Sequence, residues 1–325
     1  MTRKQTSCSD CQSVDRRSFM KTVGGAAVAG AVAPAFARFA HAAPATKATA
    51  TTAVQRFYET LSEKQLLGIA FPFDHQLRKK IHANWHITKP TIGGDFYTKE
   101  QRELMKDIVR NVTTEDGFER LMQQMDDDAG GFEEYSVAVF GEPGKGKFEW
   151  ELTGRHLTLR ADGDSVDKSA FGGPIVYGHG EESPADNMYH SHTKQLNEVF
   201  KTLDEKHAKK ALLKKAPKES AVQLQGQDGK FPGLAIGKLA SDQKELVEKT
   251  LKVLLSPYRE EDIDEVMSIL KAGGGLDKLH MAFYEQGDLE SDKVWDIWRL
   301  EGPSFVWHFR GVPHVHAYIN ISELV

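Results

Sequence analysis

Cysteine is nearly absent from this sequence of 325 residues, and its two copies, Cys8 and Cys11, both lie close to the first residue. They precede the stretch DRRSFMK at residues 15–21, whose paired arginines match the twin-arginine export signature. Once such a signal is removed, the chain holds no cysteine, which excludes disulfides and thiolate metal ligands. Any bound metal would then be held by histidine, carboxylate, tyrosine or water.

Long apolar runs and an excess of positive charge are also missing. The Gly- and Ala-rich run that follows the paired arginines is short, weakly apolar and interrupted by Pro34, so it predicts a signal rather than a membrane span. The tripeptide AHA at 40–42 fits a cleavage site, which makes residues 1–42 the predicted twin-arginine signal peptide. We expect export by the twin-arginine (Tat) machinery to the periplasm or the extracellular space, with no integral membrane segment in the mature chain.

The charge balance of the mature chain points away from nucleic acid as a partner. Beyond residue 42, 36 Lys and Arg face 45 Asp and Glu, a formal charge of −9. A polyanion is repelled by such a surface. The expected partner is therefore a small-molecule ligand or substrate.

Residues 43–55 form an Ala/Thr linker that we predict to be disordered. After it, the sequence repeats itself. LSEKQ at 61–65 recurs as LDEKH at 203–207, and TKEQREL at 98–104 recurs as ASDQKEL at 240–246, both at an offset of 142. This recurrence predicts an internal duplication, with repeat 1 at 53–177, a connector at 178–194 and repeat 2 at 195–322.

The predicted fold class is α+β. In each repeat, about three helices precede an antiparallel β-meander, because strands with hairpin-length links follow the helical periodicity. We expect strands near 134–140, 147–153 and 155–161, and again near 278–285, 294–300, 303–310 and 314–321. The two meanders are expected to join into one sheet, so that the two copies form one pseudo-symmetric domain.

The stretch PHVHAYI at 313–319 places two histidines two residues apart. In a strand, His314, His316 and Tyr318 share one face. On the predicted strand 155–161, His156 and Arg160 likewise share a face, while the leucines between them occupy the other. Two strands thus present histidines on polar faces, which indicates a candidate metal site.

The recurrence provides an internal control on these histidines. Residues that the architecture needs tend to recur, as the tryptophans of WELTG and WRLEG do, whereas His156 aligns with Ser304. A site present in one place only is therefore expected. Neutral imidazole suits zinc, copper, iron or nickel, and three histidines with an open fourth position make a catalytic type of site. We predict His156, His314 and His316 as ligands of a zinc or copper ion, with His86 as a fourth.

Three further residues are predicted to contact a substrate. Tyr177 lies in the Gly-rich segment GGPIVYGHGE at 172–181, which is interpreted as a loop between the repeats that lies across the site. Tyr318 and Arg160 share the strand faces of the histidines. The acidic run DDD at 126–128 lacks the spacing of a calcium loop and predicts a solvated helix end.

Several of these stretches resemble one protein family, the domain of unknown function 3500. WELTGRHLTL, LEGPSFVWHF and PHVHAYI resemble its strand motifs, and LSEKQLLGIAFPFD with NWH resembles its opening. The resemblance covers the whole mature chain. It implies that His156, His314 and His316 belong to a shared pattern, and His86 more loosely, but it implies no particular activity.

Three hypotheses follow from the sequence. The first is an exported metalloprotein with a mononuclear histidine site, acting as a hydrolase through bound water or as an oxidoreductase through copper. The second is a non-catalytic periplasmic module that binds a small acidic or aromatic ligand between the lobes. The third is a structural envelope protein with no site.

Overall fold

A computed structural model describes residues 49–323, so the predicted signal peptide at 1–42 lies outside the described part of the chain. Within residues 49–323 the chain forms eight α-helices and one sheet of eleven strands. The helices are α2 (Ala50–Glu59), α3 (Glu63–Ile69), α4 (Lys99–Asn111), α5 (Glu115–Ala129), α6 (Ser191–Lys201), α7 (Glu205–Ala211), α8 (Ser241–Leu255) and α9 (Glu260–Ala272).

Pairs of helices alternate with groups of strands along the chain. They are β1 (Ala70–Phe71), β2 (Ser136–Gly141), β3 (Phe148–Gly154), β4 (Leu157–Ala161), β5 (Ile175–His179), β6 (Leu212–Leu213), β7 (Leu234–Ala235), β8 (His280–Tyr284), β9 (Ile297–Gly302), β10 (Phe305–Arg310) and β11 (Val315–Ile321). The α+β class predicted from the sequence is confirmed in its mixed helix and sheet content.

The strands follow the order β1-β2-β3-β4-β5-β11-β10-β9-β8-β6, and β7 pairs with β8 beside this path. The two meanders therefore join into one sheet, as expected, through the antiparallel pair β5 and β11. The sheet is mixed rather than wholly antiparallel, because the two-residue strands β1 and β6 run parallel to β2 and β8. These two strands directly follow α3 and α7, and their shortness hid them from the periodicity of the sequence.

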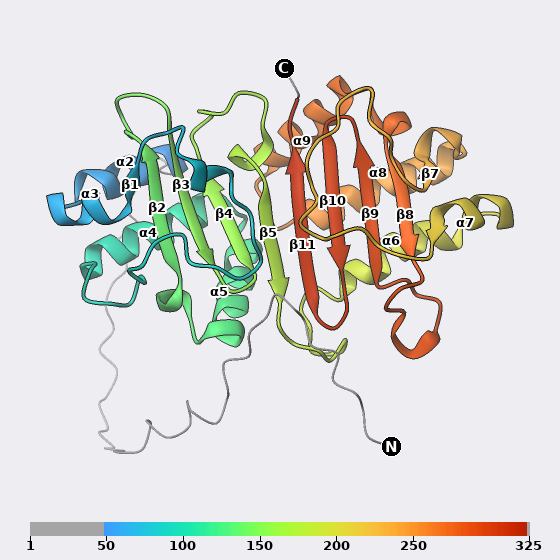
Figure 1. Cartoon of the computed structure of the whole chain (residues 1–325), viewed down its shortest axis with the longest axis horizontal. Coiled ribbons are helices and arrows are strands. Elements are labelled where there is room, and N and C mark those ends of the chain that lie inside the picture. Colours follow the sequence, from blue (N-terminus) through green and yellow to red (C-terminus); the bar gives the residue numbers. More distant parts are fainter. Residues whose placement is uncertain (1–48, 324–325) are drawn as a thin grey trace, which may run out of the picture. The chain divides into compact units, whose positions relative to one another are not determined.

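The sheet lies between two unlike layers. Behind it in Figure 1 are the helices, and in front of it run two irregular stretches, residues 72–97 and 214–233, which we call the covering segments. On every strand the side chains alternate between these layers. Trp150, Leu152 and Trp298 pack on the helices in the main core, whereas Ala138 and Ile297 pack in smaller clusters under the covering segments. Both faces of the sheet are thus buried.

Two predictions about the first half of the chain need correction. The linker predicted at 43–55 is partly helical, because α2 starts at Ala50, where the hydroxyl of Thr49 accepts from the N–H of Thr52 and Val54 and Phe57 become fully buried. The Gly-rich segment 172–181 is not a loop. It contains β5, whose Ile175–His179 backbone is paired on both sides, with β4 and with β11.

The recurring sequence pairs mark helix starts. LSEKQ begins α3, where Ser62 and Gln65 form a capping box, and LDEKH begins α7, where the Asp204 side chain accepts from the N–H of His207. TKEQREL begins α4 with the same box from Thr98 and Gln101. The recurring stretches thus share a local structural role at helix N-termini.

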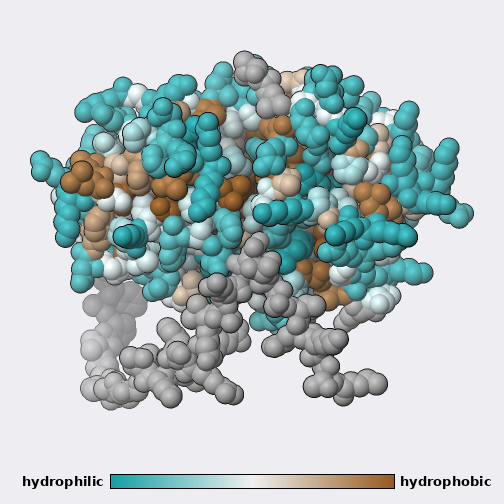
Figure 2. Space-filling model, viewed as in Figure 1, coloured by the Kyte–Doolittle hydropathy of each residue, from teal (hydrophilic) through white to brown (hydrophobic). Residues whose placement is uncertain are grey.

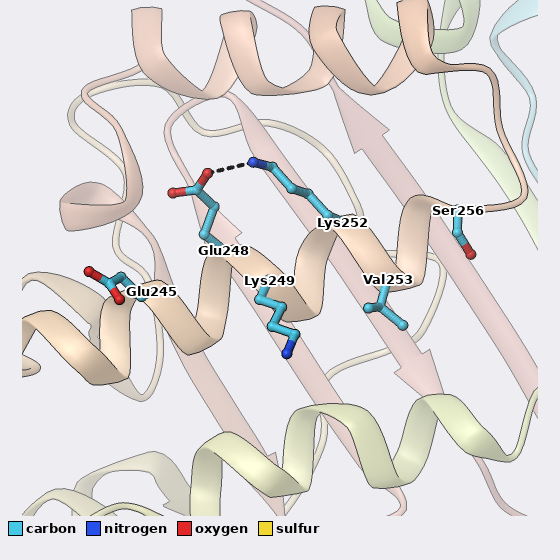
Figure 3. A pocket seen from close by; sticks show the side chains of 6 residues that line it. All are labelled: Glu245, Glu248, Lys249, Lys252, Val253 and Ser256. Atoms are coloured by element: carbon cyan, nitrogen blue, oxygen red, sulfur yellow. Dashed lines mark ion pairs between the residues drawn. The ribbon is translucent and has the colours of Figure 1, made fainter.

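Among the described residues, the exposed large hydrophobic side chains are Leu67 and Val253. Figure 2 shows the covering side as mainly hydrophilic, with apolar residues in small scattered groups. On the helical side, a shallow depression follows the exposed face of α8, where Glu248 and Lys252 pair at 2.8 Å (Figure 3). Among the helices of residues 49–323, none combines the length and the apolarity needed to cross a bilayer.

Candidate metal centre

His156 occupies the two-residue turn between β3 and β4, not a position within the predicted strand 155–161. Its backbone has a φ of 57°, in the left-handed region that a histidine seldom adopts. Its N–H donates to the carbonyl oxygen of Ala83, in the first covering segment, at 2.6 Å. This bond holds the turn in a conformation that costs energy, as is common for residues at functional sites.

His316 lies within β11 and His314 directly before it, and the two-residue spacing puts both on the covering side, as predicted. Strand β5 separates β11 from β4, and its Gly178 pairs with His316. A Cβ at Gly178 would lie 3.3 Å from the Cβ of His156. The absence of a side chain there leaves the space through which His156 reaches across β5 toward His316.

The three imidazoles form a nearly equilateral triangle. Ring centroids are 5.0 Å apart for His156 and His314, 4.8 Å for His156 and His316, and 4.9 Å for His314 and His316. One ligand nitrogen from each ring lies within 4.8 Å of the other two. The Nε2 atoms of His314 and His316 are 3.1 Å apart, close to the roughly 3.3 Å between two nitrogens of a tetrahedral zinc site.

Two carboxylates contact the Nδ1 atoms of two of the three imidazoles. The Nδ1 of His156 is 2.8 Å from Oδ2 of Asp128, and the Nδ1 of His316 is 3.0 Å from Oε1 of Glu219. A carboxylate accepts a hydrogen bond from the N–H at Nδ1, which fixes the tautomer in which Nε2 carries a lone pair. Both rings therefore direct their ligating nitrogen inward. This arrangement is usual around histidines that bind a metal.

Asp128 itself is held by several donors. The N–H of Gly180 donates to its Oδ1 at 2.7 Å and the amide of Gln124 to its Oδ2 at 2.7 Å. Burial acts to raise the pKa of Asp128, but the hydrogen bonds and the charge interaction with His156, with help from Gln124 and Gly180, lower it below its ordinary value. The carboxylate is thus ionised and oriented before any ion arrives.

Burial keeps two of the imidazoles neutral. It lowers the pKa of His314 to about 2, with the other two histidines and nearby arginines adding to the effect, and it lowers the pKa of His316 well below its ordinary value. Only a neutral imidazole offers a lone pair to a metal. These two histidines are therefore in the ligating form at neutral pH.

Replacing Asp128 with asparagine is expected to weaken metal binding by roughly 10- to 100-fold, because the uncharged amide is a poorer acceptor for His156. Asp126 stands in the same acidic run but is exposed, so Asp126→Asn is the matched control. Competition with a chromophoric chelator measures both affinities. Equal affinities in the two variants would contradict the role given to Asp128.

The other predicted site residues lie in different surroundings. His86 is exposed and is not part of the histidine cluster formed among residues 49–323. Tyr318 is buried on the covering side, two residues from His316. Arg160 is also buried on that side, but its guanidinium is engaged by the carboxylates of Glu149 and Glu151. An arginine held in this way is poorly placed to contact a substrate.

Tyr177 lies on the opposite face of the sheet from the three histidines. Its side chain packs in the helical core, and its hydroxyl is 2.8 Å from Nδ1 of His192, which is buried on α6. The register explains the difference: Tyr177 pairs with Ala317, whose side chain also points to the helices. The sequence interpretation failed here because it treated a strand as a loop and so had no face to assign.

Replacing His192 with phenylalanine is expected to flatten the pH dependence of stability. Burial lowers the pKa of His192 from 6.5 to about 3, so below pH 6.5 the unfolded chain binds a proton that the folded chain does not. Stability of the native protein relative to the variant should then fall by about 2 kcal/mol from pH 7 to pH 5. Urea unfolding at both pH values measures this, and an unchanged difference would refute it.

Asp128 and Glu219 were not predicted from the sequence. Asp128 ends an acidic run that was predicted to be solvated, yet its side chain is buried against His156. Glu219 belongs to the second covering segment, which carries no periodic pattern, and it reaches His316 from a distant part of the sequence. Nothing in the local sequence marks either residue. Their role becomes visible only once the chain has folded.

The protein is thus of the α+β class. Its mixed sheet carries helices on one face and a buried three-histidine cluster on the other. A family model described as a protein of unknown function (DUF3500) matches residues 43–319. The chain belongs to this family, as the strand motifs indicated. No curated protein and no solved structure matches the chain.

Proposed function

We propose that this protein is an exported metalloprotein in which His156, His314 and His316 bind one zinc or copper ion. This proposal depends on one observation. Three buried ligand nitrogens lie within 4.8 Å of one another, and carboxylates contact the Nδ1 atoms of two of the rings. Zinc and copper both accept imidazole, and the absence of cysteine after residue 11 fits a site made of nitrogen ligands.

Three protein ligands leave a fourth coordination position for water or substrate. Bound water at such a position can serve as a nucleophile for hydrolysis, and a copper ion can support an oxidation. A second candidate is a non-catalytic role, in which the ion fastens β11 to the turn before β4. The full burial of His156 and His316 favours this alternative.

We also propose that the fold arose by internal duplication and that the protein is exported. Both halves of the described chain have two helices, a short-strand segment, two helices and then four strands of the meander, which supports internal duplication. The short-strand segment is β1 in the first half and β6 with β7 in the second. The sheet order is symmetric about the β5 and β11 pair, which supports a pseudo-twofold axis there. The DRRSFMK stretch supports export by the twin-arginine route to the periplasm or beyond.

Elemental analysis of the protein produced with its own signal tests the metal site. We expect about one transition metal ion per chain, and the identity of that ion chooses the activity assay. Removal with a chelator should lower the melting temperature, and addition of Zn²⁺ or Cu²⁺ should restore it, since an ion that binds only the folded state stabilises it. A folded protein that holds no metal and takes up neither ion would refute the proposal.

A further inference from the structure

Two arginines lie beside the histidine cluster, each next to one of its carboxylates. The Nε of Arg310 is 2.7 Å from Oε2 of Glu219, and its Nη1 donates to the carbonyl oxygen of Val312 at 3.2 Å. Arg155 lies farther from its carboxylate. Its Nε is 3.9 Å from Oδ1 of Asp128, which is too long for a hydrogen bond. Among residues 49–323 this buried Nε has no hydrogen-bond partner.

Arg155 is close to the ring of His156. The position that a Cβ would take on Gly180 is 3.0 Å from Nη2 of Arg155 and 3.1 Å from Cε1 of His156. The guanidinium and the imidazole are therefore neighbours across one glycine. Cε1 lies between Nδ1 and Nε2 in the imidazole ring. The positive charge of Arg155 thus stands beside the ring of His156.

The two arginines are also more accessible than the ligands. The side chain of Arg155 is 25% exposed and that of Arg310 is 14% exposed, whereas His156 and His316 are fully buried. A molecule approaching the cluster from solvent on this side would meet an arginine first.

The balance of charge around the cluster is positive once an ion is bound. The two arginines offset the carboxylates of Asp128 and Glu219, so the charge of a bound ion would remain uncompensated. A cationic or an apolar ligand gains nothing from such a site. A ligand with a negative charge gains from both the ion and the guanidinium.

We propose that the open coordination position takes a small oxyanion, a carboxylate or phosphate group, and that Arg155 is the residue that selects it. The planar guanidinium binds two oxygens of such a group in parallel, which an ammonium cannot do. One oxygen of the group reaches the ion while Arg155 binds another. This inference rests on the proposed metal site and deepens it by naming the class of ligand.

A purely structural role for Arg155 would be to hold Asp128. The 3.9 Å separation argues against it, because Asp128 already receives hydrogen bonds from His156, Gln124 and Gly180 at 2.7 to 2.8 Å. Arg310 provides the contrast within the same site, since it contacts its carboxylate at 2.7 Å. Arg310 is occupied by Glu219, and Arg155 keeps donors for a ligand.

The test uses Co²⁺-loaded protein, whose visible spectrum reports a change of ligands at the ion. Acetate and inorganic phosphate are titrated separately into the native protein, Arg155→Met, Arg155→Lys and the control Arg110→Met. Arg110 is an exposed arginine on α4, so its replacement removes one charge far from the cluster's turn and strands. Bound Co²⁺ is counted in each sample before any anion is added.

We expect at least one of the two anions to change the native spectrum with saturation. Its dissociation constant should rise by roughly 10- to 100-fold in Arg155→Met, less in Arg155→Lys, and not in Arg110→Met, since a hydrogen bond to a charged group contributes about 1.5–3 kcal/mol. The anion that binds more tightly identifies the carboxylate or the phosphate class.

Two failures are distinguishable. A folded protein that binds no Co²⁺ would overturn the proposed metal site and the oxyanion inference with it. A protein that binds Co²⁺ but whose spectrum is unchanged by both anions, or equally changed in Arg155→Met, would overturn the oxyanion inference and leave the metal site standing.

Discussion

Replacing both His314 and His316 with alanine is expected to reduce the bound transition metal from about one ion per chain to none. A structural zinc ion held by four ligands binds with about 10–16 kcal/mol, so each ligand contributes on the order of 3 kcal/mol. Loss of one histidine should therefore weaken binding by roughly 100-fold, and loss of two leaves only His156. Elemental analysis measures the loss of the ion when both histidines are replaced. Chelator competition measures the weaker affinity when one histidine is replaced.

The control for this experiment must also remove a buried imidazole. His308 on β10 is suitable, because it is buried on the same side of the sheet, pairs with Tyr318 in the register, and lies outside the cluster. His308→Ala should keep the ion although it loses stability by a similar cavity effect. His86→Ala should also keep the ion, since His86 is exposed. Metal loss in either control would contradict the three-histidine assignment.

Replacing Gly117 with alanine is expected to destabilise the fold by about 3 kcal/mol, although alanine favours a helix interior over glycine by about 1 kcal/mol. Gly117 is in the first turn of α5, and a Cβ there would lie 1.9 Å from the backbone oxygen of Pro257. The same oxygen accepts from the N–H of Thr114 at 3.0 Å, so the two segments cannot separate without losing this bond.

Thermal unfolding measures this effect, and a fall in the melting temperature of roughly 5–10 °C is expected. The matched control is Gly146→Ala in the loop between β2 and β3, where a Cβ meets nothing within 4 Å. That variant should stay within about 0.5 kcal/mol of the native protein. A stabilised Gly117→Ala would show that helix propensity outweighs the contact with Pro257.

The sequence predicted the elements whose signals are local. The helices were predicted from their hydrophobic periodicity, a signal that lies within each helix. Most strands of the two meanders were predicted from the alternation of apolar and polar residues and from the hairpin-length links between them. Strand β5 was not, since its Gly178 and its glycine-rich flanks resemble a loop. Its strand character comes from pairing with β4 and β11, which are distant in sequence.

The candidate site shows the same division. His314 and His316 were predicted together because two-residue spacing in a strand fixes a shared face. His156 was predicted for a face but lies in a turn, where its φ of 57° rather than strand alternation aims the ring. Asp128 and Glu219 could not be predicted, because each meets its histidine only through tertiary packing. His86 was favoured by its motif, and its exposed position gives it no such contact.

The order of the ligands along the chain has a consequence for how the protein is made. His156 is synthesised well before His314 and His316, and the latter two take their place only when β11 pairs with β5. A nascent chain can therefore complete its first meander without being able to retain an ion through all three histidines. Metal acquisition would follow closure of the sheet rather than nucleate folding, in contrast to small zinc domains whose ligands are close in sequence.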